Sequence, residues 1–263
     1  NWDELDDESD PFTRCDIDIC IHVFPDSRIA SKAKSSGIMM RIGTSHRIYH
    51  LWTCNSLVNL GRKNSPLHES QLNMKLLAPL EVKTDYSLEE INNFIGWKKA
   101  ETNDTGILPD NGKFNLALHM KSQGSAAEWP LNNYLSVIEV LYDKCNIIVT
   151  GTSAEEKMVM EAKPEILSHP AVVNTFGKLT LDQLIDTLGQ CDGMVACSTG
   201  PLHIASVSGV HTLGLYPDQK PMDSGRWGPI GPNSTVLSGK INEQGDLDIS
   251  TSSVLSIIRS WIR

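Results

Sequence analysis

The sequence predicts an α/β protein with a doubly wound parallel sheet, the architecture of many nucleotide-binding proteins. From Leu116 onward, short apolar runs alternate with helical patterns. Strands separated by helices require right-handed crossovers, which place helices on both faces of a parallel sheet. Hydrophobic residues make up 40% of the 263 residues and charged residues 21%, a composition typical of globular proteins.

Charge and hydropathy exclude other classes of protein. The formal net charge of −9 argues against a general nucleic-acid binder, because neutralising phosphates needs a basic surface. No apolar run approaches the roughly 20 residues of a membrane-spanning helix. The acidic start has neither an initiator Met nor an apolar signal core, so we expect a soluble chain whose natural beginning lies upstream.

The cysteines do not form a metal-binding or disulfide pattern. There is no Cys-x-x-Cys pair and no His at zinc-finger distance from two cysteines. Most lie in or beside apolar segments, where a free thiol behaves as a small hydrophobic group. We therefore expect no metal site, and reduced structural thiols in a cytosolic protein, at Cys15, Cys20, Cys54, Cys145, Cys191 and Cys197.

The second half of the chain supplies most of the expected elements. Strands are predicted at residues 116–119, 146–150, 172–174, 194–196 and 212–215, and helices at 130–142, 153–162, from 181, and 201–207. The helix from 181 is the best specified, because Thr180 and Gln183 have capping-box spacing and Gly189 is the expected stop. Its apolar stripe consists of Leu181, Leu184, Ile185 and Leu188.

The first third is similar but less regular. We expect strands at 17–24 and 38–42, a helix at 27–34 ended by Gly37, and helical spacing over 67–77. A turn-rich linker at 102–113 and an amphipathic helix after Ser252 complete the organisation. The predicted domains are therefore 1–105, 113–250 and a closing helix at 251–263. Two such halves about a hinge place a cleft at the carboxyl ends of their strands.

The strongest local signal lies where the strand at 194–196 passes into the next helix. Ser198, Thr199 and Gly200 precede Pro201, which suits the first helical turn because its missing N–H costs nothing there. Free backbone N–H groups and the positive helix end form a site for an anion, and His203 lies one turn further on. The alternative is an ordinary capped helix with a half-buried histidine.

Two other strand-to-helix turns strengthen this interpretation. Residues 119–130 form a Gly/Ser loop that leads into a helix, a geometry suited to phosphate oxygens, although a plain surface turn has the same composition. At 150–156, Glu155 could accept both hydroxyls of a ribose. The alternative for Glu155 is a carboxylate that complements the helix dipole.

An ordered set of motifs resembles glycosyltransferase family nine, the ADP-heptose:lipopolysaccharide heptosyltransferases. The motifs are Gly151 with Glu155, residues 177–181, 198–203 and 226–229, and in the first third residues 37–43 and the His68-Glu69 pair. The resemblance implies a GT-B fold, in which two Rossmann-like domains face a cleft, here with an incomplete N-terminal domain. It further implies inverting, metal-independent transfer of heptose from ADP-heptose to the lipopolysaccharide inner core, without a cofactor, by a cytoplasmic protein in peripheral contact with the inner membrane.

The resemblance also assigns donor-binding residues. Ser198, Thr199, Gly200 and His203 would hold the diphosphate, and Glu155 the adenosine ribose. The remaining assignments place Leu179 and Thr180 at the adenine pocket and Ser122 and Gln123 at a phosphate from the opposite loop. Without a metal, the charge on the departing ADP must be stabilised by helix N-termini, hydroxyls and fixed cations.

The chain departs from the family pattern at three places. Ala127 stands where Lys or Arg is usual, with Lys121 as an alternative cation, and Ser198 stands where Asp is usual. The family's catalytic Asp, which would deprotonate the acceptor hydroxyl, is expected upstream of Asn1. These departures keep two alternatives open: a catalytically incomplete nucleotide-sugar-binding module, and a GT-B transferase or epimerase that uses a UDP-sugar.

A basic cluster in the first third is the candidate acceptor site. Arg47, Arg62 and Lys63 are the proposed contacts to anionic groups, with Arg47 suited to a bidentate one. Solvated basic residues around a loop are the alternative. The full cluster is Arg41, His46, Arg47, His50, Arg62, Lys63 and His68. For the nearby Trp52, we expect a place in the core rather than against lipid headgroups.

Overall fold

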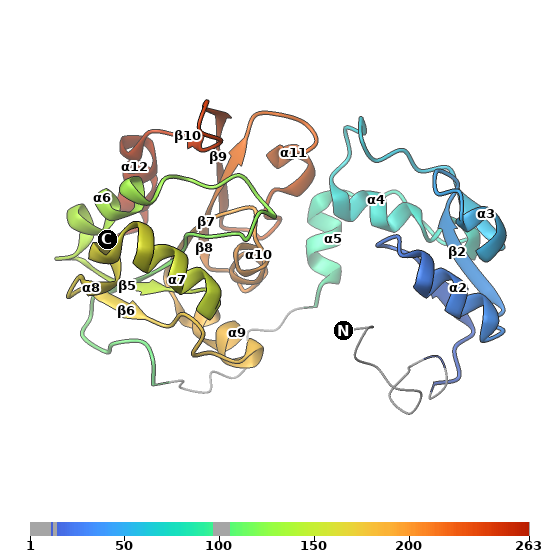
Figure 1. Ribbon diagram of the computed structural model, residues 1–263, viewed down its shortest axis with the longest axis horizontal. Helices are drawn as coiled ribbons and strands as arrows, with labels where there is room; N and C mark the ends of the chain where they lie inside the picture. The colour runs from blue at the N-terminus through green and yellow to red at the C-terminus, as the bar shows by residue number, and fades with distance from the viewer. Residues whose placement is uncertain (1–11, 13–14, 97–105, 263) are drawn as a thin grey trace. The chain divides into compact units, whose positions relative to one another are not determined.

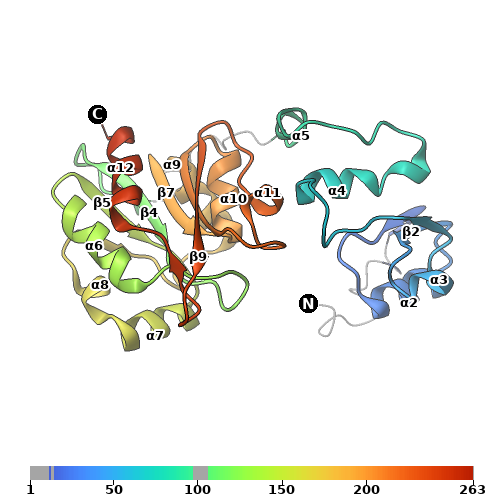
Figure 2. The same ribbon diagram turned by 90° about the horizontal axis from the view of Figure 1, so that it is seen from above.

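A computed structural model describes residues 12, 15–96 and 106–262 of the chain. The chain divides into two compact units, Asn1–Ile91 and Asn92–Arg263. Figures 1 and 2 show the elements of each unit from two directions.

The N-terminal unit is built on a parallel sheet with the order β1-β2-β3. Its strands are β1 (Ile19–Ile21), β2 (Met40–Thr44) and β3 (Ser56–Val58). Helix α2 (Ser27–Ser35) connects β1 to β2, and Asp26 caps it by accepting hydrogen bonds from the backbone N–H groups of Arg28 and Ile29. The short helix α3 (His50–Thr53) connects β2 to β3, so both crossovers are helical, as parallel strands require.

The rest of this unit is helical. It contains α4 (Glu69–Lys75), the 3₁₀ helix η2 (Ala78–Leu80) and α5 (Leu88–Phe94), which crosses the boundary between the units. His68 begins α4 through a capping box with Gln71. A small core of Leu60, Leu72 and Leu76 joins α4 to the segment after β3.

The C-terminal unit contains a seven-stranded sheet with the order β10-β9-β8-β7-β4-β5-β6. All pairs from β9 to β6 are parallel, and β10 pairs antiparallel with β9. The strands are β4 (Phe114–His119), β5 (Cys145–Val149), β6 (Val172–Asn174), β7 (Gly193–Cys197), β8 (His211–Pro217), β9 (Ser234–Ile241) and β10 (Leu247–Asp248).

Helices cover both faces of this sheet (Figure 2). They are α6 (Leu131–Leu141), α7 (Ser153–Ala162), α8 (Pro164–Ser168), α9 (Leu181–Gln190), α10 (Gly200–Val207), α11 (Ser224–Trp227) and α12 (Thr251–Trp261). One core cluster joins α6, α7, α8 and α12 to one face, and a second joins α9 and α10 to the other. Alternate residues of each strand serve the two clusters, because side chains in a strand point to opposite faces. Leu116 and Leu118 belong to the first cluster and Ala117 to the second.

The sequence predicted these C-terminal elements closely. Helix α7 and strand β6 have the predicted bounds, and Thr180 caps α9 through the expected box with Gln183. The predicted stop at Gly189 is wrong, because α9 continues to Gln190 with Cys191 as its C-cap. Gly189 is buried within the helix, where a Cβ would lie 3.9 Å from Ser208. A methyl group would make only ordinary contact there, so Gly189 neither ends α9 nor is required by its packing.

The N-terminal predictions needed larger corrections. The strand expected over 17–24 pairs only at Ile19–Ile21, and the strand expected over 38–42 is displaced to Met40–Thr44. No clear hydrophobic pattern in the sequence predicted strands β3, β9 and β10 or helices α3, α5, α8 and α11. Residues 102–105 of the expected linker lie outside the described residues, and 106–113 form turns and bends.

The cysteines do not form disulfide bonds. All six cysteines are described, and all are free thiols. Burial raises the pKa of Cys145 to about 11 and that of Cys197 to about 12, so both are protonated at neutral pH.

Among the described helices, none has the length and apolar character that crossing a bilayer would need.

Candidate functional site

Two pockets of the C-terminal unit lie at the carboxyl ends of its parallel strands. The Glu155 pocket has a volume of about 510 Å³. It is lined by His119, Thr150, Gly151, Thr152, Ser153, Glu155, Thr175, Gly177, Leu179, Leu184 and Pro201. The His203 pocket has a volume of about 380 Å³ and is lined by Ser125, Ala126, Ala127, Ser198, Thr199, Gly200, His203, Leu215, Pro217, Met222 and Trp227.

Glu155 is fixed in the first turn of α7 by a capping box. Its side chain is buried, and Oε2 accepts hydrogen bonds from the Thr152 backbone N–H at 2.7 Å and from Thr152 Oγ1 at 3.1 Å. The described residues give Oε1 no hydrogen-bond partner. A carboxylate held in this way can accept hydroxyl groups through its second oxygen. The structural alternative, a role of Glu155 in the first turn of α7, is therefore confirmed, and the ribose contact stays a prediction that would use the other oxygen.

His119 also lines the Glu155 pocket, and sequence reasoning missed it. It is the last residue of β4, it is buried, and its Nδ1 lies 3.1 Å from Thr150 Oγ1. Burial lowers the pKa of His119, while the negative charges of Glu155 and Glu128 oppose that shift. Its place at the carboxyl end of a strand was the only signal in the sequence.

Two glycines shape the wall of the Glu155 pocket. A Cβ on Gly151 would lie 2.3 Å from the Phe176 ring, and one on Gly177 would lie 2.0 Å from Ser153 Oγ. Gly177 also has φ +64°, a backbone conformation that side-chain-bearing residues adopt at a cost. The turn at Gly151 and the following loop therefore approach each other only because both positions lack side chains.

The His203 pocket is formed around the N-terminus of α10. Thr199 is the N-cap residue, yet its side chain makes no capping hydrogen bond; Oγ1 instead donates to the Cys197 carbonyl at 3.3 Å. The first-turn N–H groups of a helix have no partners within the helix, so they are available to an anion. The structure brings Ser198, Thr199, Gly200 and His203 together here, as the sequence predicts.

The rest of the lining of the His203 pocket is largely apolar. It includes Ala127, Leu215, Met222 and Trp227. Ser198 forms a hydrogen bond with Tyr216, which moderates the raised pKa that burial gives this phenol, and the Tyr216 hydroxyl donates to the Trp227 carbonyl at 2.7 Å. The two departures from the family pattern, Ala127 and Ser198, thus lie in one pocket.

The Gly/Ser loop is held by its own carboxylate, Glu128. Lys121 Nζ forms an ion pair with Glu128, and the Ser122 backbone N–H donates to Glu128 Oε1 at 2.8 Å. The Ser122 hydroxyl also contacts Glu128 and the Ala126 carbonyl. Lys121, the alternative cation, is therefore neutralised within the loop. Gln123 instead reaches the Glu155 pocket, where its Nε2 donates to Thr152 Oγ1 at 2.9 Å.

The two residues assigned to the adenine pocket lie differently. Leu179 lines the Glu155 pocket. Thr180 is exposed, and its hydroxyl accepts a hydrogen bond from the Gln183 N–H as the cap of α9. Thr180 therefore has a structural role as the cap of α9, and it is not among the residues that line the Glu155 pocket.

The basic cluster of the N-terminal unit divides into engaged and exposed groups. Arg62 is paired with Glu69, and Arg62 Nη2 donates to Asn73 Oδ1 at 3.1 Å. Arg47 and Lys63 are exposed. The other members mostly support the fold: Arg41 donates to backbone carbonyls, His50 is buried against Thr44, and His68 caps α4. Of the three predicted acceptor contacts, two are thus accessible from solvent.

The prediction of a core position for Trp52 is wrong. Its side chain is 57% exposed. The helical turns around α3 place His50 and Thr53 inward and Trp52 outward. A polar face of α3 packs on the unit, so the aromatic residue takes the solvent side.

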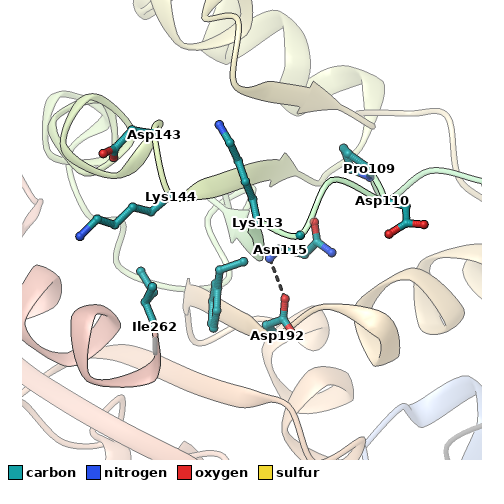
Figure 3. A pocket seen from close by; sticks show the side chains of 10 residues that line it. Pro109, Asp110, Lys113, Asn115, Asp143, Lys144, Asp192 and Ile262 are labelled. Carbon is teal, nitrogen blue, oxygen red and sulfur yellow. Dashed lines mark hydrogen bonds between the residues drawn. The ribbon is translucent and has the colours of Figure 1, made fainter.

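Other candidate sites are weaker. A recess of about 730 Å³ at the amino end of β4 is lined by Asp110, Lys113, Asp143, Lys144 and Asp192 among others. Figure 3 shows its charged side chains pointing in different directions rather than toward one point, and the drawn hydrogen bond joins the Asn115 N–H to Asp192 at 2.8 Å. Within the described ranges, no three His, Cys, Asp or Glu side chains are grouped to hold a metal ion.

Comparison with known proteins connects this site to a family. The family model described as glycosyltransferase family 9 (heptosyltransferase) matches residues 29–254. A putative glycosyltransferase of Haemophilus influenzae is 26% identical over 223 residues, which is 81% of this chain and 64% of the relative. The lipopolysaccharide core heptosyltransferase OpsX of the same organism is 27% identical over 141 residues, 49% of this chain and 41% of the relative. The chain thus spans less than two thirds of the length of either curated relative.

Solved structures show the same fold. A family 9 glycosyltransferase from Veillonella parvula aligns with a TM-score of 0.70 and 19% identity, covering 93% of this chain and 73% of that one. The ADP-heptose lipopolysaccharide heptosyltransferase II of E. coli aligns with a TM-score of 0.67 and 15% identity, covering 95% and 77%. These likenesses confirm the predicted GT-B fold. With a family model that matches most of its length, the chain belongs to glycosyltransferase family 9.

Proposed function

We propose that the C-terminal unit binds ADP-heptose and that the protein transfers its heptose to the lipopolysaccharide inner core, with inversion and without a metal ion. One observation supports the donor site above all others. The turn from Ser198 to His203 borders both pockets, because Pro201 lines the Glu155 pocket and Gly200 and His203 line the His203 pocket. A diphosphate held at this turn therefore has its nucleoside on one side and its sugar on the other.

The chemistry of the turn suits a diphosphate leaving group. The first-turn N–H groups of α10, the hydroxyls of Ser198 and Thr199 and the His203 ring supply hydrogen-bond donors. The N–H groups are fixed donors that stabilise negative charge as it develops on the departing ADP. The Thr199 hydroxyl, which donates to the Cys197 carbonyl, must turn toward the phosphate to contribute. In this proposal Glu155 Oε1 accepts ribose hydroxyls, Leu179 contacts the adenine and Gln123 contacts a phosphate from the facing loop.

The acceptor side rests on the N-terminal unit. Arg47 and Lys63 are exposed cations that would bind the carboxylates and phosphates of a lipopolysaccharide precursor. The precursor lies in a membrane, so we place the protein in peripheral contact with the cytoplasmic face of the inner membrane. OpsX of H. influenzae is named as a lipopolysaccharide core heptosyltransferase, which supports this class of acceptor.

A nucleotide-sugar-binding module that transfers nothing is the second candidate. It is favoured by the apolar Ala127 wall of the His203 pocket and by the pairing of Lys121 with Glu128. Both features reduce the positive charge available to a diphosphate. In a transfer assay with ADP-heptose and inner-core acceptor, this module would bind the donor and release no ADP.

Isothermal titration calorimetry with ADP and UDP tests the donor site. We expect ADP to bind more tightly than UDP, because the larger adenine ring would bury more apolar surface against Leu179, whereas Glu155 would contact the ribose that both nucleotides share. Thr199→Ala and His203→Ala should each weaken ADP binding about ten- to a hundred-fold, the usual loss for a hydrogen bond to a charged group. His169→Ala, a half-buried histidine outside both pockets, is the matched control. No heat with ADP, or tighter binding of UDP, would refute the proposed donor.

A further inference from the structure

The turns around α3 have an inverted distribution of polarity. Ile48, Leu51 and Trp52 follow the spacing of one helical face, and their side chains are 71%, 56% and 57% exposed. The opposite face consists of His50, Thr53 and Cys54, all of them buried. A helix that packs on a soluble core normally turns its apolar face inward. Here the largest apolar side chains are left outside.

The buried face holds α3 in place through polar contacts. His50 Nδ1 accepts a hydrogen bond from the Thr44 backbone N–H at 3.0 Å, and Arg41 Nε of β2 donates to the Thr53 carbonyl at 2.7 Å. The orientation of α3 therefore does not depend on Ile48, Leu51 or Trp52. Adjacent exposed apolar side chains with no such role in packing typically mark an interaction surface.

Positive charge surrounds these side chains. Residues 27–68 contain seven Lys and Arg and no Asp or Glu, although the whole chain has a net charge of −9. Two of the seven, Arg28 and Arg62, are paired with the flanking Asp26 and Glu69. Exposed Arg47 directly precedes Ile48, and Lys34 Nζ donates to the Trp52 carbonyl at 2.7 Å. The surface formed by Ile48, Leu51, Trp52, Lys34 and Arg47, called the α3 face below, is therefore both apolar and cationic.

We propose that the α3 face docks on an anionic lipid bilayer. In this arrangement the Trp52 indole lies at the headgroup level, where amphipathic aromatic rings accumulate. Ile48 and Leu51 enter the boundary between headgroups and acyl chains. Lys34 and Arg47 face phosphates at the bilayer surface, which for Arg47 include those of the membrane-embedded acceptor precursor. The α3 face would thus be the surface through which the protein makes the membrane contact of the proposed function. Only this link to the lipopolysaccharide membrane rests on that function.

A second copy of the chain is a poorer occupant. In a two-fold dimer the same patch meets itself, so Lys34 and Arg47 would face their own counterparts. One short helix with three apolar side chains also offers far less area than the roughly 800 Å² per partner of a stable interface. A bilayer with anionic headgroups complements both the apolar centre and the charge.

Sedimentation with lipid vesicles tests the proposal. Wild-type protein should bind vesicles of phosphatidylethanolamine with phosphatidylglycerol at least about ten-fold more tightly than vesicles of phosphatidylcholine, since each surface cation adds about 1 kcal/mol on an anionic membrane. The triple variant Ile48→Ser, Leu51→Ser, Trp52→Ser should lose at least about ten-fold in binding, because it has much less apolar surface to bury in the bilayer. Leu181→Ser, an apolar side chain 65% exposed in the other unit, is the matched control and should bind as wild type does.

A spectroscopic variant keeps the test independent of folding in the triple variant. Trp52→Phe retains the apolar surface but removes the reporter, so brominated acyl chains should quench part of the wild-type tryptophan fluorescence and little of that of the variant. Equal quenching in both proteins, or wild-type sedimentation by the folded triple variant, would overturn the proposal. A triple variant that alters only the oligomeric state, measured by light scattering, would assign the face to dimerisation and also overturn it. ADP calorimetry on the same variants should be unchanged, so failure of lipid binding and failure of the donor site are separate results.

Discussion

At the scale of single residues, Glu155 has a structural role and, in the proposed donor site, a chemical one as well. Oε2 completes the capping box of α7, while Oε1 is left for a ligand. Glutamine can complete the same box, but it has no charge and only one acceptor oxygen. The two roles are thus separable by one substitution.

Glu155→Gln should weaken ADP binding about ten-fold, the usual loss for a hydrogen bond to a charged group, while leaving thermal stability nearly unchanged. Calorimetry and thermal unfolding measure the two effects. Glu156→Gln makes the same charge change in the same helical turn, at a side chain that bonds Asn174 and does not line the pocket. An ADP affinity equal in both variants would show that Glu155 has only its capping role.

Gly177 is a second residue whose identity is dictated locally. Gly177→Ala adds a Cβ at φ +64° and 2.0 Å from Ser153 Oγ. Gly209→Ala is a matched control, because Gly209 has φ +81° and a Cβ added there would meet no heavy atom within 4 Å. Both substitutions should lose about 1 kcal/mol from the left-handed backbone, and urea unfolding should show a larger loss for Gly177→Ala. Equal losses would mean that the loop relaxes away from Ser153 without cost.

At the scale of elements, Trp129 links the entry of α6 to the segment before α12. Its ring is buried, packs edge-on against Tyr134, and donates from Nε1 to the Ile249 carbonyl at 2.8 Å. Trp129→Phe should destabilise the protein by about 2–4 kcal/mol, through the unpaired carbonyl and the space left by the smaller ring. Trp52→Phe, at an exposed indole, should stay within about 0.5 kcal/mol of wild type. A Trp129 variant as stable as the Trp52 variant would show that this link does not hold the two segments together.

Elements were predictable where their signals are local. The cap Thr180 lies within three residues of its partner Gln183, so the sequence alone predicted where α9 begins. The Thr152–Glu155 box of α7 is equally local, and the start of α7 was predicted without it. Gly189 misled because its burial beside Ser208 depends on a neighbouring helix. The prediction of a core position for Trp52 was wrong because α3 packs its polar face on the unit. Which face is buried depends on the packing partner and does not follow from helical spacing.

The candidate site divides in the same way. Ser198, Thr199, Gly200 and His203 are almost contiguous, so their convergence at one helix N-terminus followed from the sequence. His119 contacts a residue that follows the neighbouring strand, and Glu128 contacts a residue at the other end of its own loop. Their contacts with Thr150 and Lys121 arise only when the sheet and loop are assembled.

At the scale of the whole molecule, buried histidines give stability a defined pH dependence. Burial lowers the pKa values of His22, His50 and His119 in the folded protein below their ordinary value of 6.5. The unfolded chain therefore binds more protons as the pH falls below about 6.5, and the free energy of unfolding must decrease there. The loss can reach about 1.4 kcal/mol per pH unit for each such group.

Urea unfolding measured between pH 7.5 and 5 should show this decrease, before the carboxylates begin to protonate. His119→Gln should make the pH dependence shallower, because one of the lowered groups is removed. The lowered pKa values of Asp26 and Glu90 act near pH 4 and below, so they do not contribute in this interval. Stability that is constant or rises toward pH 5 would contradict this role of the buried histidines.

The most direct test of the donor site is a crystal structure of the protein with ADP. We expect both phosphoryl groups within hydrogen-bond distance of the first-turn N–H groups of α10 and of Thr199. The ribose should lie against Glu155 and the adenine beside Leu179. A nucleotide bound elsewhere, or an empty turn at Ser198–His203 under saturating ADP, would contradict the proposed donor site.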